Sequence, residues 1–428
     1  MKKGNLIVGL DVGTSKVCTI VGETHTLDRP RWNPFSRDTD RNGALSMFEQ
    51  VEIIGVGHSP SRGLRKGVVV NIEDTVESIR KAVETAETMA DVEIKGVHVG
   101  ITGGHIQSFS SHGVIAVKEK DINQREVEKV IDAARAMAIP FDREVLHVMP
   151  VGFAVDGQNG IHDPRGMTGV RLEVNVRIIT GAVASVQNLI KSCHMAGLEI
   201  IDIVLDPLAV AAATLSSEEK ELGVGIVDMG AGTTDIALFH QGSLCHTAVL
   251  SIGGNNFTND VAIGLRITAS EAEKIKKKYG YSQLSMIKEN DAMDVVYPGD
   301  KQVRKIPRQL LIEILQPRAE EILSLVKDEI VKSGYHGLMT SGVVLTGGTV
   351  LMPGMNGMAE NILELPVRIG SPRGFGGMHD ISSNPMFITA AGLVLYGRKE
   401  IVHERHFHNE SAMLGMSSKM KGWVKGIF

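Results

Sequence analysis

Two short segments of the chain repeat one pattern of residues that could bind phosphate. Residues 6–22 (LIVGLDVGTSKVCTIVG) and residues 223–239 (GVGIVDMGAGTTDIALF) each predict a strand, a Gly/Thr turn and a second strand, with an aspartate just before the turn. Glycine lets the backbone approach an anion, consecutive N–H groups form an anion site, and hydroxyl and ammonium groups add donors. The candidate phosphate-binding residues are Gly13, Thr14, Ser15 and Lys16 in the first turn, and Gly230, Gly232, Thr233 and Thr234 in the second.

The aspartates before the turns, Asp11 and Asp228, are candidate catalytic and metal-binding residues. Mg²⁺ takes few carboxylates and keeps several waters, so one carboxylate beside each turn suits a Mg²⁺–phosphate complex. A tight β-turn between two strands is the alternative for either segment alone. Two further glycine-rich elements favour phosphate binding, namely Gly253–Gly254 and the run Thr346–Gly347–Gly348 that leads to Met352.

The elements that must position these residues follow from hydrophobic periodicity. Short Val/Ile-rich runs alternate with amphipathic helices, which favours sheets covered by helices. Two copies of one turn, about half a chain apart, predict a duplicated α/β architecture with a cleft between its halves. Helix starts are expected at Asn71, at Asp121 with Gln124, at Asp206–Pro207 before 208–215, at Thr268 for a helix ending near Gly280, and at Asn384–Pro385 before 388–397.

Length and composition exclude several classes of protein. The chain has 428 residues, enough for two to four domains of ~100–200 residues. Its 45 basic and 50 acidic residues give a net charge of −5, which argues against nucleic acid as the main partner. Three scattered cysteines are too few for a disulfide framework or a zinc cluster. The uncharged run 338–359 is rich in glycine, which predicts a loop between buried strands instead of a membrane span.

The order of the motifs resembles the nucleotide-binding elements of the superfamily that contains actin, sugar kinases and Hsp70. That order is first turn, Ala-rich helix 208–215, second turn, TGG loop and Ala/Gly-rich helix 388–397. Within the superfamily, the chain is most similar to the FtsA family of bacterial cell-division proteins, over nearly its whole length. The segments that carry this resemblance are 66–87 (KGVVVNIEDTVESIRKAVETAE), 221–237 (ELGVGIVDMGAGTTDIA), 267–280 (ITASEAEKIKKKYG), 341–355 (SGVVLTGGTVLMPGM) and a short amphipathic tail.

The resemblance implies that ATP binds in the cleft, with Asp11 and Asp228 flanking Mg²⁺ and the γ-phosphate. It also implies that Gly253 and Gly254 belong to the site, and that Gly347, Gly348 and Met352 border the adenosine. Glu273 and Lys276 lie at i and i+3 on one helix face and resemble the family's ribose-contacting pair, with a solvated ion pair as the alternative. No motif identifies a water-positioning glutamine, so slow ATP hydrolysis at most is expected and enzymatic activity stays open.

The resemblance further implies an actin-like duplicated fold with an inserted small domain, called 1C, and a C-terminal amphipathic helix. The expected boundaries are 1–92 for subdomain 1A (with 177–206 and about 380–398), 93–176 for 1C, 207–252 for 2A (with 336–379), 253–335 for 2B, 399–412 for a linker and 413–428 for the tail. Residues 24–48 are polar and are expected to form an inserted exposed loop.

The tail has the pattern of a membrane-surface helix. At 100° per residue, Met416, Met420, Trp423, Val424 and Ile427 share one face with Phe428 at its edge, whereas Lys421 and Lys425 lie opposite and Lys419 borders the apolar face. Fourteen helical residues span only ~21 Å, so such a helix would lie in the interface of an anionic membrane without crossing it. A helix that docks onto the chain's own core or onto a protein partner is the alternative.

A basic cluster precedes the helical segment 309–330. In the FtsA family this part resembles subdomain 2B, which receives the C-terminal peptide of the tubulin-like protein FtsZ, and the candidates for that contact are Arg304, Lys305, Arg308 and Arg318. A solvated charged surface is the alternative. The resemblance also implies self-association into filaments, further division partners at 1C, and a peripheral location on the cytoplasmic face of the inner membrane at midcell. The rival functions are an actin-like pilus-assembly component, a small-molecule kinase and a chaperone ATPase.

Overall fold

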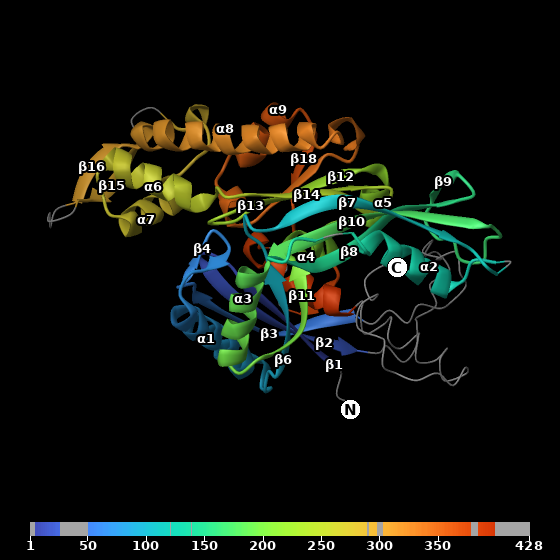
Figure 1. Ribbon diagram of the computed structural model, residues 1–428. Helices are drawn as coiled ribbons and strands as arrows, with labels where there is room; N and C mark the ends of the chain where they lie inside the picture. The colour runs from blue at the N-terminus through green and yellow to red at the C-terminus, as the bar shows by residue number, and fades with distance from the viewer. Residues whose placement is uncertain are drawn as a thin grey trace, which may run out of the picture.

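Two large sheets with helices between and outside them form the body of the molecule, and a third sheet projects from one side (Figure 1). The structure is a computed structural model that describes residues 5–25, 50–119, 121–137, 139–288, 291–297, 303–377 and 384–398. The predicted α/β architecture is confirmed.

The first large sheet has the strand order β11-β6-β1-β2-β3-β19. Alternate side chains of β1 serve two cores: Val8 and Leu10 pack with helices α1 and α3, whereas Ile7 packs toward the second sheet. Asp11 lies on the same face of β1 as Ile7, so the pleat aims it at the middle of the molecule. The elements are β1 (Asn5–Val12), β2 (Lys16–His25), β3 (Gln50–Pro60), α1 (Ile72–Ala90), β6 (Gly96–Ile101), α3 (Val183–Met195), β11 (Glu199–Leu205) and β19 (Phe375–Gly377).

The second large sheet has the order β14-β13-β12-β17-β18 and repeats this arrangement. On β12, Val227 and Met229 pack against the outer helices, whereas Val224 and Ile226 face the middle layer together with Asp228. The elements are β12 (Val224–Met229), β13 (Thr234–His240), β14 (Ser243–Leu250), α6 (Gly254–Leu265), α7 (Ala269–Tyr279), α8 (Arg308–Lys332), β17 (Val343–Thr346), α9 (Met355–Leu363) and β18 (Val367–Ile369).

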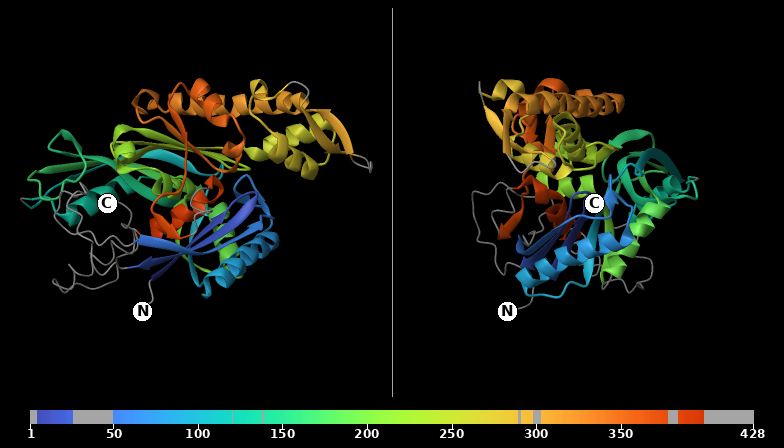
Figure 2. Two further views of the ribbon diagram at one scale, coloured as in Figure 1. Left: turned by 180° about the vertical axis from the view of Figure 1, so that it is seen from behind. Right: turned by 90° about the vertical axis from the view of Figure 1, so that its left-hand side faces the viewer.

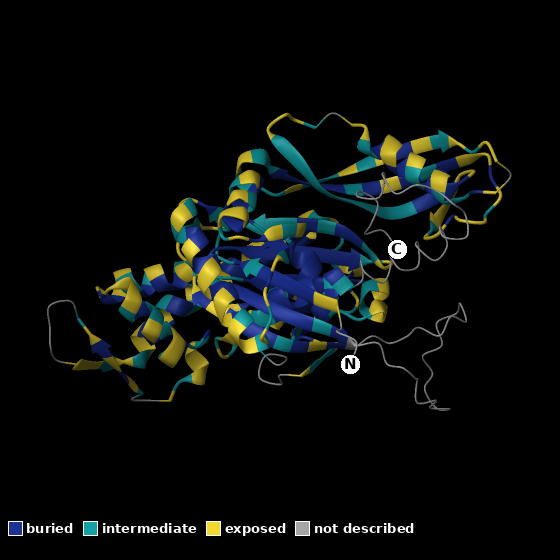
Figure 3. Cartoon of the chain, turned by 90° about the horizontal axis from the view of Figure 1, so that it is seen from below, coloured by how far each residue is buried: buried dark blue, intermediate teal, exposed yellow. Residues whose placement is uncertain are grey.

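Two alanine-rich helices fill the middle layer between the large sheets. They are α4 (Asp206–Thr214) and the helical residues 388–398, and nearly all of their side chains are buried, as the dark blue centre of Figure 3 illustrates. A Cβ on Gly392 would lie 1.9 Å from the Ala209 carbonyl oxygen, so the two backbones are in contact where the helices cross. The small residues therefore allow one core to join the two halves.

The third sheet, with the order β7-β10-β8-β9, forms the inserted domain beside β14 (Figures 1 and 2). Helix α2 covers one face and buries Val127, Val130 and Ile131 against the strands. The expected bounds 93–176 for this domain include β6, but β6 pairs with β1 and β11 in the first large sheet. The elements are β7 (Gln107–Ala116), α2 (Gln124–Arg135), β8 (Arg143–Val155), β9 (Gln158–Ile161) and β10 (Arg171–Ala182).

The smaller elements complete the connections. They are β4 (Leu64–Arg65), β5 (Val68–Val69), α5 (Ser217–Leu222), β15 (Ala292–Val296), β16 (Val303–Pro307) and the short 3₁₀ turns η1 (Leu284–Met286), η2 (His336–Leu338), η3 (Gly348–Leu351) and η4 (Pro385–Phe387). The glycine-rich run 338–359 is not a loop between two strands as predicted, because it contains β17 and η3 and continues into α9. Among the described helices, none is long and apolar enough to cross a membrane.

Most helix starts agree with the sequence, and two differ. Asn71 caps α1, Thr268 caps α7, and Asn384 caps η4, as predicted. Helix α2 is capped by Asn123 and Glu126 instead of Asp121, because the Asp121 carboxylate accepts a hydrogen bond from the Thr168 hydroxyl at 2.8 Å. Asp206 is not the cap of α4 but its first residue.

Candidate functional site

The first turn joins β1 to β2 in the way that the glycine pattern predicts. The Gly13 amide donates to the Lys16 carbonyl oxygen at 3.0 Å, which closes the turn directly after Asp11 and Val12. The Thr14 hydroxyl accepts a hydrogen bond from the Gly67 amide at 3.0 Å, so the β4–β5 hairpin holds the tip of the turn.

The second turn has the same geometry between β12 and β13. The Gly230 amide donates to the Thr233 carbonyl oxygen at 2.9 Å, just as Gly13 donates to Lys16. In the strand register, Asp228 lies opposite Asp235, at the place where Asp11 lies opposite Cys18. The sequence repeat is therefore a structural repeat.

The tips of the two turns meet. A Cβ on Gly232 would lie 2.6 Å from Thr14 Oγ1 and 2.9 Å from Thr14 Cγ2. Only a residue without a side chain fits between the turns at this distance. The candidate residues of the two turns, more than 200 positions apart, are thus brought to one place.

Four carboxylates form a buried acidic cluster behind the turns: Asp11, Asp206, Asp228 and Asp235. Burial raises the pKa of Asp228 to about 7 and that of Asp235 to about 6, and neighbouring carboxylates add to both shifts. Burial, with repulsion from Asp11, Asp235 and Asp228, raises the pKa of Asp206 well above its ordinary value. The charged forms of these carboxylates are therefore disfavoured, and a nearby cation would favour them.

Hydroxyl groups hold two members of the acidic cluster in place. The Thr102 hydroxyl donates to Asp235 Oδ1, and the Thr233 hydroxyl donates to Asp235 Oδ2 at 3.1 Å. The Thr389 hydroxyl donates to Asp228 Oδ2 at 3.4 Å. The Asp206 Oδ1 atom is buried and has no hydrogen-bond partner within the described part of the chain.

Asp206 and Asp235 were not among the predicted site residues. Asp206 was assigned to helix capping, because Asp–Pro is a common helix start. Asp235 follows the two threonines of the second turn. The matching residue of the first segment is Cys18, so the repeated pattern does not mark Asp235 as a site residue.

Lys16 occupies a different place from that expected of a phosphate donor. Its Nζ atom contacts the Met386 carbonyl oxygen of η4 and lies 4.3 Å from the centre of the Phe387 ring. The Phe387 ring stacks on His58 with 6.2 Å between ring centres. Lys16 therefore joins the first turn to η4 in this structure, and phosphate binding by Lys16 stays a prediction.

Gly253, Gly254, Glu273 and Lys276 lie together at the start of α6. Lys276 Nζ donates to the Gly254 carbonyl oxygen at 2.9 Å and forms an ion pair with Glu273 at 2.6 Å. The Gly254 amide in turn donates to the Gly230 carbonyl oxygen at 2.9 Å. The predicted Glu–Lys pair is thus tied to the second turn through Gly254 and is more than a pair of solvated charges.

The TGG loop approaches the acidic cluster from β17. Gly347 has a φ of +89°, and a Cβ there would lie 2.4 Å from Asp228 Oδ1. The Thr349 hydroxyl donates to the Gly230 carbonyl oxygen at 3.0 Å, which joins this loop to the second turn. A Cβ on Gly348 would lie 3.8 Å from Met386 Cγ of η4, and Met352 packs against the core of the second half.

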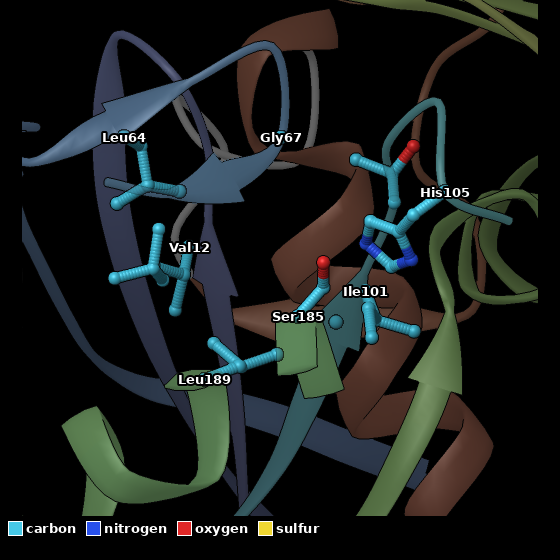
Figure 4. A pocket seen from close by; sticks show the side chains of 10 residues that line it. Val12, Leu64, Gly67, Ile101, His105, Ser185 and Leu189 are labelled. Atoms are coloured by element: carbon cyan, nitrogen blue, oxygen red, sulfur yellow. The ribbon is translucent and has the colours of Figure 1, made fainter. Parts of the chain in front are cut away.

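A small cavity of about 10 Å³ lies behind the first turn. Figure 4 shows His105 and Ser185 on one side of it and Val12 and Leu64 on the other. This volume suffices for one water at most, so the cavity is not a ligand site.

Comparison with known proteins decides which branch of the fold this is. A family model described as "Cell division protein FtsA" matches residues 225–392, and one described as "SHS2 domain inserted in FTSA" matches residues 103–180. The cell division protein FtsA of Pseudomonas aeruginosa is 41% identical over 435 aligned residues, which cover 100% of this chain and 99% of the relative. The chain belongs to the FtsA family of cell division proteins.

Other relatives agree with this assignment, and solved structures share the fold. FtsA of Borreliella burgdorferi is 40% identical, and the alignment covers 98% of this chain and 98% of the relative. FtsA of Escherichia coli K12 is 33% identical, and the alignment covers 99% of this chain and 96% of the relative. A PilM–PilN type IV pilus biogenesis complex matches with a TM-score of 0.63 at 16% identity, covering 91% of this chain and 98% of the matched chain. MreB5 of Spiroplasma citri bound to ADP matches with a TM-score of 0.53 at 15% identity, covering 95% of this chain and 99% of the matched chain. These structural matches establish the actin-like fold.

The predicted partner-binding residues of this FtsA-family chain fall into two groups. Arg308 and Arg318 are held by internal partners: Arg308 pairs with Asp291 at 2.8 Å, and Arg318 pairs with Asp260 at 2.6 Å. Arg304 and Lys305 lie on β16 and are exposed, with Arg304 over the Tyr297 ring.

Lys305 lines a groove of about 620 Å³ between η1, the β15–β16 hairpin and the start of α8. Its lining combines apolar side chains, two lysines and one aspartate that is paired with Arg308, chiefly Leu284, Ile287, Ile306, Pro307, Lys288, Lys305 and Asp291. The residues of the predicted FtsA tail, 413–428, and of the linker before it lie outside the described residues.

Proposed function

We propose that this FtsA-family chain binds ATP with Mg²⁺, polymerises on the cytoplasmic face of the bacterial inner membrane, and anchors the FtsZ ring there at midcell. In this role it recruits later division proteins through its inserted domain. The observation that carries the nucleotide part is the meeting of the two equivalent turns at Thr14 and Gly232, beside the acidic cluster. The ADP in the MreB structure of the same fold supports this choice of ligand.

The acidic cluster fits a hydrated divalent cation. The buried Asp206 Oδ1 lacks a partner within the described residues. Burial first, and neighbouring carboxylates second, raise the pKa of Asp228 and Asp235, and a cation would stabilise the charged form of both. Within the described residues, no three acidic, His or Cys side chains converge on one point as direct ligands of a metal would. Asp11 and Asp228 would therefore hold Mg²⁺ through water, as Mg²⁺ prefers. Bound Mg²⁺ would supply the positive charge that neutralises the phosphates.

The chain's own groups then divide the binding of ATP between them. The Gly/Thr turns face each other and offer amides and hydroxyls to the phosphates from both halves. Gly347 keeps the wall beside Asp228 free of side-chain atoms. Lys276 and Glu273 are held beside Gly254 and would contact the ribose, with the adenosine between them and Met352.

ATP would act mainly as a ligand that joins the two halves. Because each turn belongs to a different half, binding to both favours the arrangement in which the turns meet. That arrangement is the one in which protomers would polymerise. Hydrolysis is slow at most in this proposal.

The groove beside β16 supports the FtsZ part of the proposal. An extended or helical peptide with apolar and acidic side chains would fit its apolar floor and its two lysines, Lys288 and Lys305. Arg308 pairs with Asp291 and lies over the Tyr281 ring. Arg318 pairs with Asp260 of α6. Both guanidinium groups therefore already have partners within the chain, and we assign the peptide contact to the lysines.

The membrane part rests on the tail pattern. One short amphipathic helix binds lipid weakly, comparable to a single acyl chain at roughly 10⁴ M⁻¹. Many tails on one filament would bind together and raise the overall affinity without new contacts. Polymerisation and membrane residence would therefore depend on each other.

Calorimetric titration of the full chain with ATP and Mg²⁺ tests the nucleotide part. The wild-type chain should bind, and Asp228→Asn should weaken binding about tenfold or more, equivalent to about 1.4 kcal/mol. Asp163→Asn, at an exposed aspartate paired with Arg165 in the inserted domain, serves as the matched control and should bind like wild type. Equal affinities for all three chains would refute this assignment of the site.

A further inference from the structure

The inserted sheet is fastened at its root by one arginine. Arg143, the first residue of β8, donates to the His105 carbonyl oxygen at 2.8 Å, just before β7. It also donates to the Thr180 carbonyl oxygen at 3.0 Å and to the Thr180 hydroxyl at 2.8 Å, both on β10. Arg143 therefore joins the roots of β7, β8 and β10 into one unit.

A second contact leads from this root into the acidic cluster. Thr102 follows β6 directly and lies three residues before His105, and its hydroxyl donates to Asp235 Oδ1 of the other half. The turn between Thr102 and His105 is tight, with Gly103 at a φ of +135° and the Ile106 amide bonded to the Gly103 carbonyl oxygen at 3.0 Å. A displacement of Thr102 would therefore also displace His105, and with it the carbonyl oxygen that Arg143 binds.

The inserted sheet also touches the second half at a separate place. The Arg177 guanidinium on β10 donates to the Cys245 carbonyl oxygen on β14. A Cβ on Gly104 would lie 2.7 Å from Ser251 Oγ, so the root of the sheet is also in contact with the segment after β14. The sheet is covalently part of the first half and bonded to the second, so a change in their relative position alters at least one contact.

We propose that Thr102 and Arg143 transmit the occupancy of the acidic cluster to the inserted sheet. The proposal rests on the cation and nucleotide site described above. With a cation bound near the four carboxylates, Asp235 would be drawn toward it, and the hydrogen bond that Asp235 Oδ1 accepts from the Thr102 hydroxyl would weaken. Because a ligand shifts a conformational equilibrium only through contacts that differ between the two states, the Thr102–Asp235 hydrogen bond is the contact on which this coupling depends.

The coupling has a direct consequence for the division machinery. A partner that binds the inserted sheet in one orientation would bind differently to the filled and to the empty form of the chain. By reciprocity, such a partner would change the nucleotide affinity by the same factor. The inserted domain would then report nucleotide state to the surface without any contact of its own with the ligand.

Hydrogen exchange of the full chain, with and without ATP and Mg²⁺, tests the proposal. Ligand should change exchange in residues 107–116, 143–155 and 171–182 of the wild type by about fivefold, within the usual range of such couplings. Thr102→Val keeps the shape but removes the donor and should lose the response, whereas Thr102→Ser should keep it. Thr88→Val is the control, because the Thr88 hydroxyl donates only to Glu84 within α1.

Arg143→Lys provides a second route that leaves the acidic cluster intact. It should bind ATP and Mg²⁺ as wild type does by calorimetry and yet lose the response in residues 107–116, since the root of the sheet is no longer joined. Ligand binding without any change in the wild-type sheet, or an equal change in Thr102→Val, would overturn this inference alone. Absence of ligand binding by the wild type would overturn both it and the proposed function.

Discussion

Gly232 of the second turn lies directly against Thr14 of the first, with room for no side-chain atom between them. This contact joins two segments that repeat one sequence pattern and one hydrogen-bonded turn, Gly13 to Lys16 and Gly230 to Thr233. The duplicated halves therefore face each other through these turns, whose amides and hydroxyls the proposed function assigns to the phosphates of ATP.

Gly232→Ala should separate the two turns. The new methyl group would lie 2.6 Å from Thr14 Oγ1, which the Gly67 amide holds in place, so the halves must move apart. We expect affinity for ATP with Mg²⁺ to fall about tenfold, as calorimetry would measure, equivalent to about 1.4 kcal/mol. Gly337→Ala, in open surroundings of the same half, is the control and should leave the affinity unchanged.

Gly392→Ala should destabilise the fold itself. Its Cβ would lie 1.9 Å from the Ala209 carbonyl oxygen, and two backbones cannot yield as a flexible side chain can. Overpacking of this kind costs about 1–3 kcal/mol or more, which chemical denaturation would measure as a lower free energy of unfolding. Gly357→Ala in α9 meets no atom within 4 Å and should instead gain up to ~1 kcal/mol of helix propensity. Equal stability of the two variants would contradict the helix crossing.

Asp228→Asn should change how stability depends on pH. The pKa of Asp228 is about 7 in the folded chain and 3.8 when unperturbed, so between these values the folded state holds a proton that the unfolded state has lost. The contribution of Asp228 to the free energy of unfolding therefore falls as pH rises from about 4 to 7. The asparagine variant lacks this loss, so its stability relative to wild type should increase across that window and level off above pH 8.

Buried histidines change the free energy of unfolding with pH in the opposite direction. The quantity to measure is therefore the difference in free energy of unfolding between wild type and Asp228→Asn. Burial lowers the pKa of His98 and His147 to about 4, so their contribution to stability is lost as pH falls from about 6.5 to 4. Both chains share that term. At pH 8, Mg²⁺ should raise the melting temperature of wild type by a few degrees and that of Asp228→Asn by less. A difference in stability that does not vary with pH would show that Asp228 is not protonated in the fold.

Lys305→Glu and Lys288→Glu should each weaken binding of the FtsZ C-terminal peptide. Both lysines line the groove, and reversal of one charge at an exposed rim should reduce the affinity about fivefold, equivalent to about 1 kcal/mol, as fluorescence anisotropy with a labelled peptide would measure. Lys274→Glu, exposed on α7, is the control. Arg318→Met should lower stability through the loss of the Asp260 pair and leave peptide affinity within twofold. If Arg318→Met abolished peptide binding in a folded chain, the groove assignment would be wrong.

The local pattern predicted much of the fold, and chain topology limited the rest. Strand–turn–strand segments, glycine stops and Asn caps depend on neighbouring residues, so the turns, α1 and α7 could be predicted. The place of β6 could not, because its pairing with β1 and β11 depends on contacts about 90 and 100 residues away. The N-cap of α2 is Asn123, two residues after the predicted Asp121. The Asp121 carboxylate instead accepts a hydrogen bond from the hydroxyl of Thr168, which is remote in sequence.

In the candidate site, too, features set by neighbouring residues could be predicted and contacts between remote segments could not. Residues of the turns and the Glu273–Lys276 pair have recognisable spacing and are brought together. Asp206 and Asp235 became visible only when the middle helix and β13 placed them beside Asp11 and Asp228. Lys16 has the residue type of a phosphate donor, yet its contacts with Met386 and Phe387 depend on a segment about 370 residues away.

Co-sedimentation with anionic liposomes tests the central claim, that nucleotide-dependent assembly holds this chain on membranes, most directly. The intact chain, a chain ending at Ser411 and Trp423→Glu would each be spun with and without ATP and Mg²⁺. We predict that only the intact chain pellets with the liposomes, and that it does so better with ATP and Mg²⁺. Equal sedimentation of all three chains, or none by any of them in any condition, would contradict the account.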